Sequence, residues 1–307
     1  MENKHEPVIG PVTAIASITG KSENQDSMAI WENAYARVIV VTDGLGGGEY
    51  AKYAKTASLQ VANFFIEQLS KLMADAETGP TAGMLQELFR GAKNDLVDFA
   101  AGITEIDGPG AGHLFGTTAI ILIEVKEKIV IGYTGNGAAW HIRGNFNEFP
   151  TSFLFPWNVV NVLNPHSLPE DGKEALYRLI SNGTDDDECL PSIVEIIKDR
   201  HQGDIIMICT DGIYSADQQR PGKNTKGIWI KYEPAMLIFF ERLREYFQKN
   251  LYYDQTTAEF FLDKYLEEMR HELHDDATIG LLITKEAARY QYDKKPVRDE
   301  KHTSTQL

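Results

Sequence analysis

The sequence predicts an α+β fold, a central antiparallel β-sandwich flanked by helices. Apolar, β-branched segments come in runs before and after the first helical segments, in a chain of 307 residues. The order is strands, two helices, strands, then further helices and a last strand. A parallel sheet would need strands and helices in alternation, so this order favours two antiparallel sheets covered by helices.

The first half of the chain contains six short apolar segments typical of strands. They cover residues 12–18, 27–31, 37–42, 116–125, 128–134 and 138–142. Two segments with apolar residues at helical spacing, 49–72 and 81–100, separate the third strand from the fourth. A Gly/Pro-rich loop at 107–112 leads from the second helix back to strands.

The second half is less regular at first and then repeats the alternation of strand and helix. Turn residues are frequent between 145 and 200, where we expect short helices at 171–180 and 191–198. A strand at 204–210, helices at 234–248 and 256–272 and a last strand at 277–284 follow. From residue 285 the chain is polar without an apolar period, which predicts a loosely ordered tail.

Composition excludes several classes of protein. The net charge of −15 argues against non-specific nucleic-acid binding, which needs clustered Lys and Arg. Two cysteines form no disulfide framework, and residues 1–11 have no apolar core of a signal peptide. The longest apolar stretch is far below the ~20 residues that span a bilayer. We therefore expect a cytoplasmic protein with neither membrane nor nucleic acid as partner.

Three apolar strands adjoin an aspartate. Two of them run into Asp43-Gly44 and Asp211-Gly212, and Asp275-Asp276 stands just ahead of the last. Carboxylates at the rigid rim of a sheet suit a hard cation such as Mg²⁺ or Mn²⁺. Two such ions can activate a shared water for attack on phosphorus. Asp-Gly after a strand is also simply a good turn, so the pattern alone leaves both readings open.

Other polar residues carry a weaker signal. The acidic run from Asp185 to Glu188 fails the spacing of a calcium loop and is read as a solvated loop. His113 and His141 have no visible partner and are interpreted as structural. Cys209 lies in an apolar run and is read as buried.

Six segments in chain order resemble the motifs of the PPM (PP2C-type) Ser/Thr phosphatase family. They are Lys21-Ser22-Glu23-Asn24-Gln25-Asp26-Ser27, Val41-Thr42-Asp43-Gly44-Leu45-Gly46-Gly47, Gly116-Thr117-Thr118-Ala119, the stretch from Gly132 to Trp140, Cys209-Thr210-Asp211-Gly212-Ile213-Tyr214 and Asp275-Asp276-Ala277-Thr278. The resemblance covers residues 10–285, and the ordered set is specific although each motif alone is weak.

The resemblance implies a role for each matching residue. Asp43 would bridge two metal ions and Gly44 would offer its carbonyl. Asp211 and Asp275 would complete the shell of the first ion, or Asp276 would replace Asp275 if the register shifts by one. Asp26 would orient metal-bound water from behind the ions.

Three positions depart from the family pattern. Lys21 stands where the family often has an arginine that grips the substrate phosphate, and lysine lacks that forked geometry. Asn136 replaces an aspartate that holds a third, weaker ion in many members, so a third site is doubtful here. Leu45 replaces a histidine of eukaryotic members, which points to the bacterial-type branch.

The function implied is a metal-dependent protein serine/threonine phosphatase that uses two Mn²⁺ or Mg²⁺ ions and acts by direct attack of water. Its partners would be phosphorylated proteins, a Ser/Thr kinase or the targets of one. The alternative is a pseudophosphatase, in which the same fold is a regulatory binding module. The expected organisation is a PP2C-like domain at 1–285, a variable flap-like region at 145–200 and a polar tail at 286–307.

Overall fold

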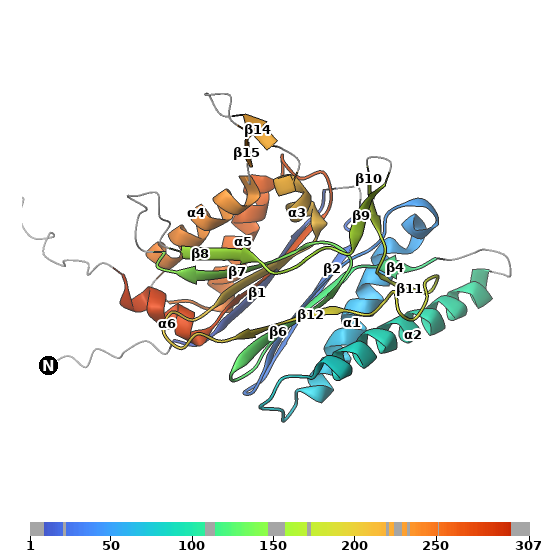
Figure 1. Cartoon of the computed structure of the whole chain (residues 1–307), viewed down its shortest axis with the longest axis horizontal. Coiled ribbons are helices and arrows are strands. Elements are labelled where there is room, and N and C mark those ends of the chain that lie inside the picture. Colours follow the sequence, from blue (N-terminus) through green and yellow to red (C-terminus); the bar gives the residue numbers. More distant parts are fainter. Residues whose placement is uncertain are drawn as a thin grey trace, which may run out of the picture.

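The computed structural model describes residues 9–20, 23–107, 114–146, 157–170, 173–218, 221–223, 229–231, 234–250 and 252–295. It confirms the expected sandwich of two antiparallel sheets with helices on both outer faces (Figure 1). No helix of the described residues is both long and apolar enough to span a membrane.

Each large sheet has five strands. The first has the order β1 (Val12–Ile18), β16 (Ala277–Ile283), β13 (Ile205–Cys209), β7 (Ala138–Gly144), β8 (Trp157–Asn161). The second has the order β12 (Ser192–Ile197), β6 (Lys128–Thr134), β5 (Ala119–Glu124), β3 (Arg37–Asp43), β2 (Asp26–Glu32). All neighbouring strands within the two sheets pair antiparallel.

Both faces of the central strands are buried, which explains their uninterrupted apolar sequences. In β3, Val38 and Val40 pack on the helix side of the second sheet. Ile39 and Val41 alternate with them and pack between the sheets. Because successive side chains of a strand point to opposite faces, such a strand has no polar face to reveal its period.

Helices cover the outside of the sandwich. α1 (Ala54–Leu72) and α2 (Ala82–Asp107) form the layer over the second sheet, preceded by the short 3₁₀ helix η1 (Gly48–Tyr53). α4 (Pro234–Lys249) and α5 (Gln255–Met269) cover the first sheet (Figure 1). Shorter elements complete the fold: α3 (Asp211–Gln218), β4 (Gly116–Thr117), β9 (Ser167–Glu170), β10 (Lys173–Leu176), β11 (Ile180–Ser181), β14 (Pro221–Lys223) and β15 (Trp229–Lys231).

The two helices expected at 171–180 and 191–198 are wrong. The described part of the first segment contains β10 and the start of β11, and the second segment is β12, which pairs along its length with β6. Four of the six residues of β12 are Ile or Val, whose branched side chains favour strands. The region 145–200 therefore supplies an outer strand to each sheet as well as the small hairpin β9–β10.

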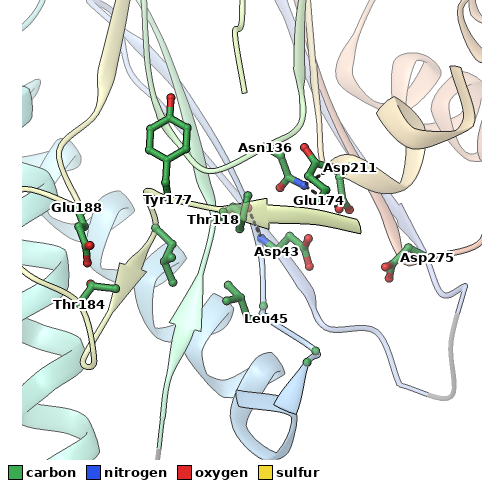
Figure 2. Close-up of a pocket in the computed structure, with 15 residues that line it drawn as sticks. Asp43, Leu45, Thr118, Asn136, Glu174, Tyr177, Thr184, Glu188, Asp211 and Asp275 are labelled. Atoms are coloured by element: carbon green, nitrogen blue, oxygen red, sulfur yellow. Dashed lines mark hydrogen bonds between the residues drawn. The ribbon is translucent and has the colours of Figure 1, made fainter. Parts of the chain in front are cut away.

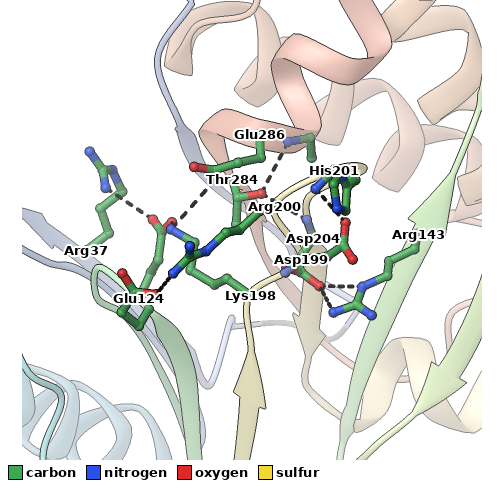
Figure 3. Close-up of polar contacts among 12 residues, drawn as sticks. Arg37, Glu124, Arg143, Lys198, Asp199, Arg200, His201, Asp204, Thr284 and Glu286 are labelled. Atoms are coloured by element: carbon green, nitrogen blue, oxygen red, sulfur yellow. Dashed lines mark hydrogen bonds and ion pairs between the residues drawn. The ribbon is translucent and has the colours of Figure 1, made fainter.

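Buried carboxylates at one end of the sandwich are paired with basic side chains (Figure 3). Glu124 accepts hydrogen bonds from Arg37 at 3.1 Å and Lys198 at 2.6 Å. The fully buried Asp204 bonds to His141 and Arg143, both at 2.7 Å. Burial alone would raise the pKa of Asp204, but the bonds from His141, the Asp199 backbone and Arg143 hold it below its usual value.

The expectation of a loose tail from residue 285 is wrong for its first nine residues. Lys285–Asp293 forms α6, whose first turn is capped by the side chain of Thr284. Ala287 and Ala288 are buried against the first sheet and α5 as part of one apolar cluster. The buried face of α6 consists of Ala287, Ala288 and Gln291, which are small or polar. The sequence therefore shows no apolar period there.

Gln291 ties α6 to the end of β7, and its loss should destabilise the protein. Its side chain donates to Gly144 O at 2.6 Å and accepts from Phe146 N at 2.9 Å. Gln291→Ala removes both hydrogen bonds to buried backbone groups, which costs about 1–3 kcal/mol for each bond lost. Urea unfolding should show the loss, whereas Arg289→Ala, on the exposed face of α6, should change the free energy of unfolding by less than about 0.5 kcal/mol. Equal effects of the two variants would contradict this role.

Candidate active site

A cleft of about 570 Å³ opens at the other end of the sandwich, where three of the predicted aspartates, Asp43, Asp211 and Asp275, line it (Figure 2) and Asp26 lies behind them. Asp26 and Asp43 face each other across the antiparallel pair β2–β3. Asp211 begins α3 just after β13, and Asp275 precedes β16. The lining residues are Asp43, Gly44, Leu45, Gly46, Gly47, Thr118, Asn136, Glu174, Leu176, Tyr177, Leu179, Thr184, Glu188, Asp211 and Asp275.

Backbone contacts fix the position of Asp43. Its carbonyl oxygen accepts from Thr118 N and from Thr117 Oγ1, each at 2.8 Å. A Cβ added to the following Gly44 would lie 2.0 Å from Ala54 O, so only glycine fits. Gly212 is under the same constraint, since its Cβ would lie 2.1 Å from Asp276 O. These glycines allow close backbone packing beside the aspartates.

Asp26 lies behind the cleft and is only 2% exposed. Its Oδ2 accepts from Thr210 Oγ1 at 2.7 Å. The hydroxyl of Thr210 in turn accepts from Thr278 N at 2.9 Å, which holds it in place between β13 and β16. This chain of contacts joins Asp26 on one sheet to the strand ends of the other.

The aspartates of the cleft have raised pKa values. Burial raises the pKa of Asp26 to about 6, although the hydrogen bond from Thr210 opposes the shift. Burial and then the charge of Asp275 raise the pKa of Asp211 to about 7. Burial, followed by the charges of Asp211 and Asp26, raises the pKa of Asp43 well above its usual range. Closely placed carboxylates without a counter-charge produce this pattern.

The cleft lacks the cations that neutralise buried carboxylates elsewhere in the fold. None of the described residues that line it is Lys, Arg or His. Within the described part of the chain, Asp26 Oδ1 and Asp211 Oδ1 are buried and have no hydrogen-bond partner. Free carboxylate oxygens with raised pKa values are what a hard divalent cation binds.

The aspartates of the cleft would supply only some of the ligands of a bound metal ion. Among the described residues no three His, Cys, Asp or Glu side chains converge into a ready ligand cluster. Mg²⁺ in particular keeps several waters and takes only one or two carboxylates from the protein. The spread of the aspartates therefore suits ions whose shells are completed by water.

Asp275 and Asp276 differ in their surroundings. Asp275 lines the cleft. Asp276 is buried, and its two oxygens accept from Gly20 N at 2.9 Å and Gln25 N at 2.7 Å. Asp276 thus holds the segment that leads to Asp26. Asp275 Oδ1 accepts from Asp276 N at 2.8 Å, and Asp275 is the one of the pair that presents its carboxylate to the cleft.

Asn136 acts as a hydrogen-bond donor between two carboxylates. It sits between two glycines with positive φ, Gly135 at 94° and Gly137 at 119°. Its Nδ2 donates to Asp211 Oδ2 at 3.0 Å and to Glu174 Oε2 at 3.4 Å. An aspartate at this position could not make either bond, because an ionised carboxylate only accepts.

Several cleft residues were not predicted from the sequence. No sequence pattern places Glu174, Tyr177 or Glu188 in a cleft. These three come from the flap-like region, whose segments reach the site through long-range pairing. The one signal present in the sequence is the acidic run at 185–188, for which the sequence predicts a solvated loop. Two residues singled out from the sequence, Lys21 as the expected phosphate ligand and His113, lie outside the described residues.

Comparison with known families gives one match. The sequence model described as protein phosphatase 2C matches residues 16–251, more than half of the chain. No curated protein sequence is similar enough to this chain to count as a match.

Solved structures share the fold at low sequence identity. The serine/threonine phosphatase of S. agalactiae is 14% identical, with a TM-score of 0.58, and the alignment covers 89% of this chain and 99% of that one. PstP/Ppp of Mycobacterium tuberculosis is 13% identical, with a TM-score of 0.56 and coverage of 89% and 98%. A structure of the PstP catalytic domain in complex with two manganese ions has a TM-score of 0.53 at 14% identity, with coverage of 89% and 98%.

The raised pKa values predict that the metal-free protein loses stability as the pH rises. Asp43 and Asp211 keep protons in the folded state that the unfolded chain has released, so the free energy of unfolding falls until the pH passes their folded pKa values. Each retained proton contributes a slope of about −1.4 kcal/mol per pH unit. Buried His166, whose pKa is lowered to about 4, contributes the opposite slope only below its unfolded value of 6.5.

Urea unfolding in chelator between pH 6.5 and 8.5 isolates the aspartates. The wild-type free energy of unfolding should fall with pH, and Asp43→Asn should fall less steeply. A wild-type protein that is equally stable across this range, or more stable at pH 8.5, would contradict the unpaired state of these carboxyls.

Proposed function

This chain belongs to the protein phosphatase 2C family of protein serine/threonine phosphatases, and we propose that it hydrolyses phosphoserine and phosphothreonine in proteins with two Mn²⁺ or Mg²⁺ ions bound in the cleft. The observation that carries the proposal is the cluster of buried Asp26 with half-buried Asp43 and Asp211, whose carboxylates have no basic partner among the described residues. The manganese-bound PstP structure supports the same cation class.

Each residue has a proposed part in the reaction. Asp43 would bridge the two ions, with the Gly44 carbonyl, Asp211 and Asp275 as the other protein ligands. Ions held there would lower the pKa of water and neutralise the oxygens of the phosphate. Asp26, held by Thr210, would accept a hydrogen bond from the attacking water and orient it. Lys21 would contact the substrate phosphate.

A third ion is not part of the proposed site. Asn136 already donates to Asp211 and Glu174, and its amide brings no charge to a cation. Asn136 also motivates the alternative function, a pseudophosphatase that binds phosphorylated partners without turnover. The two functions share one fold and differ in whether bound phosphoester is hydrolysed.

The biological setting follows from the reaction. We propose that the protein acts in the cytoplasm, reversing the phosphorylation of a Ser/Thr kinase or of its targets in a signalling pathway. The small number of cysteines agrees with a reducing compartment.

Metal-dependent turnover is the first test. With Mn²⁺ or Mg²⁺ the protein should hydrolyse p-nitrophenyl phosphate and a phosphothreonine peptide, and excess EDTA should abolish both activities. Asp43→Ala should lower kcat/KM by more than about 100-fold. Loss of a residue that only hydrogen-bonds to a metal ligand lowers metal affinity or activity by about 10–100-fold, and Asp43 is itself a proposed ligand. The matched control Asp98→Ala, on an exposed part of α2, should retain full activity.

The two candidate functions give different outcomes in the same assay. Absence of turnover on both substrates with either metal would refute the phosphatase function. Stoichiometric binding of metal and phosphopeptide without turnover would instead establish the pseudophosphatase.

Asn136→Asp tests the doubtful third ion. The variant loses both donor contacts and adds a carboxylate beside Asp211 and Glu174, so the metal-free protein should be less stable by about 1–3 kcal/mol. Calorimetric titration with Mn²⁺ should show one more bound ion than in the wild type. Asn136→Ala removes the donor without adding charge and should not gain an ion. Unchanged stoichiometry in Asn136→Asp would count against a third site at this position.

A further inference from the structure

The wall of the cleft that lies away from the aspartates is apolar and ends in a carboxylate. Leu45, Leu176 and Leu179 line the cleft together with Glu188. In Figure 2, Glu188 and Asp275 lie at opposite sides of the cleft, with Leu45 between them. A peptide that crosses the cleft from the aspartates would meet apolar surface first and Glu188 beyond it.

Main-chain pairing fixes this wall relative to Asp43. β11 (Ile180–Ser181) pairs with β4 (Gly116–Thr117), and Thr117 Oγ1 donates to Asp43 O at 2.8 Å. Next to β11, Leu179 N donates to Glu188 O at 3.0 Å. An unbroken path of hydrogen bonds and strand pairing therefore connects Glu188 to the aspartate at the centre of the site.

The acidic run of the wall is divided among three environments. Asp186 pairs with Lys93 of α2 at 2.6 Å, which anchors the loop to the helix layer. Asp187 is exposed and does not line the cleft. Glu188 faces the cleft, and its Oε2 accepts from Asp185 N at 3.0 Å. Only Glu188 of this run is in a position to contact a bound substrate.

The charges of the cleft do not cancel once two ions are bound. Two divalent cations balance the four aspartates Asp26, Asp43, Asp211 and Asp275. Glu174 and Glu188 remain, and none of the described lining residues is basic. With Lys21 proposed to contact the phosphate itself, Glu174 and Glu188 are the carboxylates left to act on the rest of the peptide, in a protein of net charge −15.

We propose, on the basis of the proposed phosphatase function, that Glu188 selects phosphorylated segments with a lysine or arginine near the phosphorylated residue. The side chain adjoining the phosphorylated residue rests on the apolar surface formed by Leu45, Leu176 and Leu179. The basic side chain beyond it pairs with Glu188. Segments with acidic residues at that position are disfavoured by like-charge repulsion.

Matched phosphothreonine peptides test this selection. Each set keeps an apolar residue next to the phosphothreonine and places Lys, Ala or Glu at one of the positions two to four residues away on either side. At one or more positions the wild-type protein should show kcat/KM for Lys about two- to fivefold above Ala, the range of an exposed ion pair, and Glu below Ala. The preference should shrink as the salt concentration rises.

Substitution of Glu188 should abolish or reverse the preference for the Lys peptide, depending on the charge of the new side chain. Glu188→Gln keeps an oxygen for the hydrogen bond from Asp185 and should bring the Lys-to-Ala ratio close to one. Glu188→Lys should favour the Glu peptide over the Lys peptide. The matched control Asp187→Asn, one residue away in the same loop, should retain the wild-type ratio. Ratios within one variant are insensitive to differences in folding or metal loading.

The outcomes separate this proposal from the phosphatase function. Hydrolysis of p-nitrophenyl phosphate without any preference for Lys peptides, or an equal effect of Asp187→Asn and Glu188→Gln, would overturn the selection and leave the phosphatase function intact. If no substrate is hydrolysed, the selection is tested by binding instead. Fluorescence anisotropy with Mn²⁺ would measure the affinities of labelled Lys and Glu phosphopeptides, and the ratio of these affinities in each variant replaces the ratio of kcat/KM values.

Discussion

Uncompensated negative charge at one end of the sandwich is the constraint on which the site depends. At the opposite end, buried Glu124 and Asp204 each have basic partners within hydrogen-bond distance. At the cleft, Asp26, Asp43 and Asp211 are brought together with no such partner among the described residues, at the cost of raised pKa values. The same fold thus neutralises buried carboxylates with its own cations at one end and, among the described residues, leaves those of the cleft without a cation at the other.

Most of the fold could be predicted because its central strands are buried on both faces. Among these, β6 has the predicted bounds, and β3 and β13 differ by a residue or less at either end. The edge strand β1 also has the predicted bounds. The wrong predictions for β12 and α6 share one cause. Both elements form through packing against segments that are distant in the sequence. β12 is an outer strand whose partner β6 lies about sixty residues earlier. α6 buries two alanines and a glutamine, which no hydrophobic pattern reveals.

The aspartates of the site could be located from the sequence because a strand end is a local feature, but their surroundings could not. Asn136 is expected from the sequence only to make a third metal site doubtful, and the structure shows it donating to Asp211 and Glu174. Gly44 is expected to offer its carbonyl to an ion, whereas the close contacts that require glycine after Asp43 and Asp211 are with the backbone of Ala54 and Asp276. Glu188 faces the cleft only because β11 pairs with β4. Such roles depend on contacts between distant segments.

The position of β16 has a consequence for synthesis of the chain on the ribosome. All five strands of the second sheet lie within residues 26–197 and can pair early. The first sheet cannot close until β16 enters between β1 and β13, where Val12 and Ile205 both face Ile283. Until then β1 and β13 present unpaired edges, which are prone to misassociation. Asp275 enters with the same strand, so the nascent protein cannot complete the proposed metal site before β16 is in place.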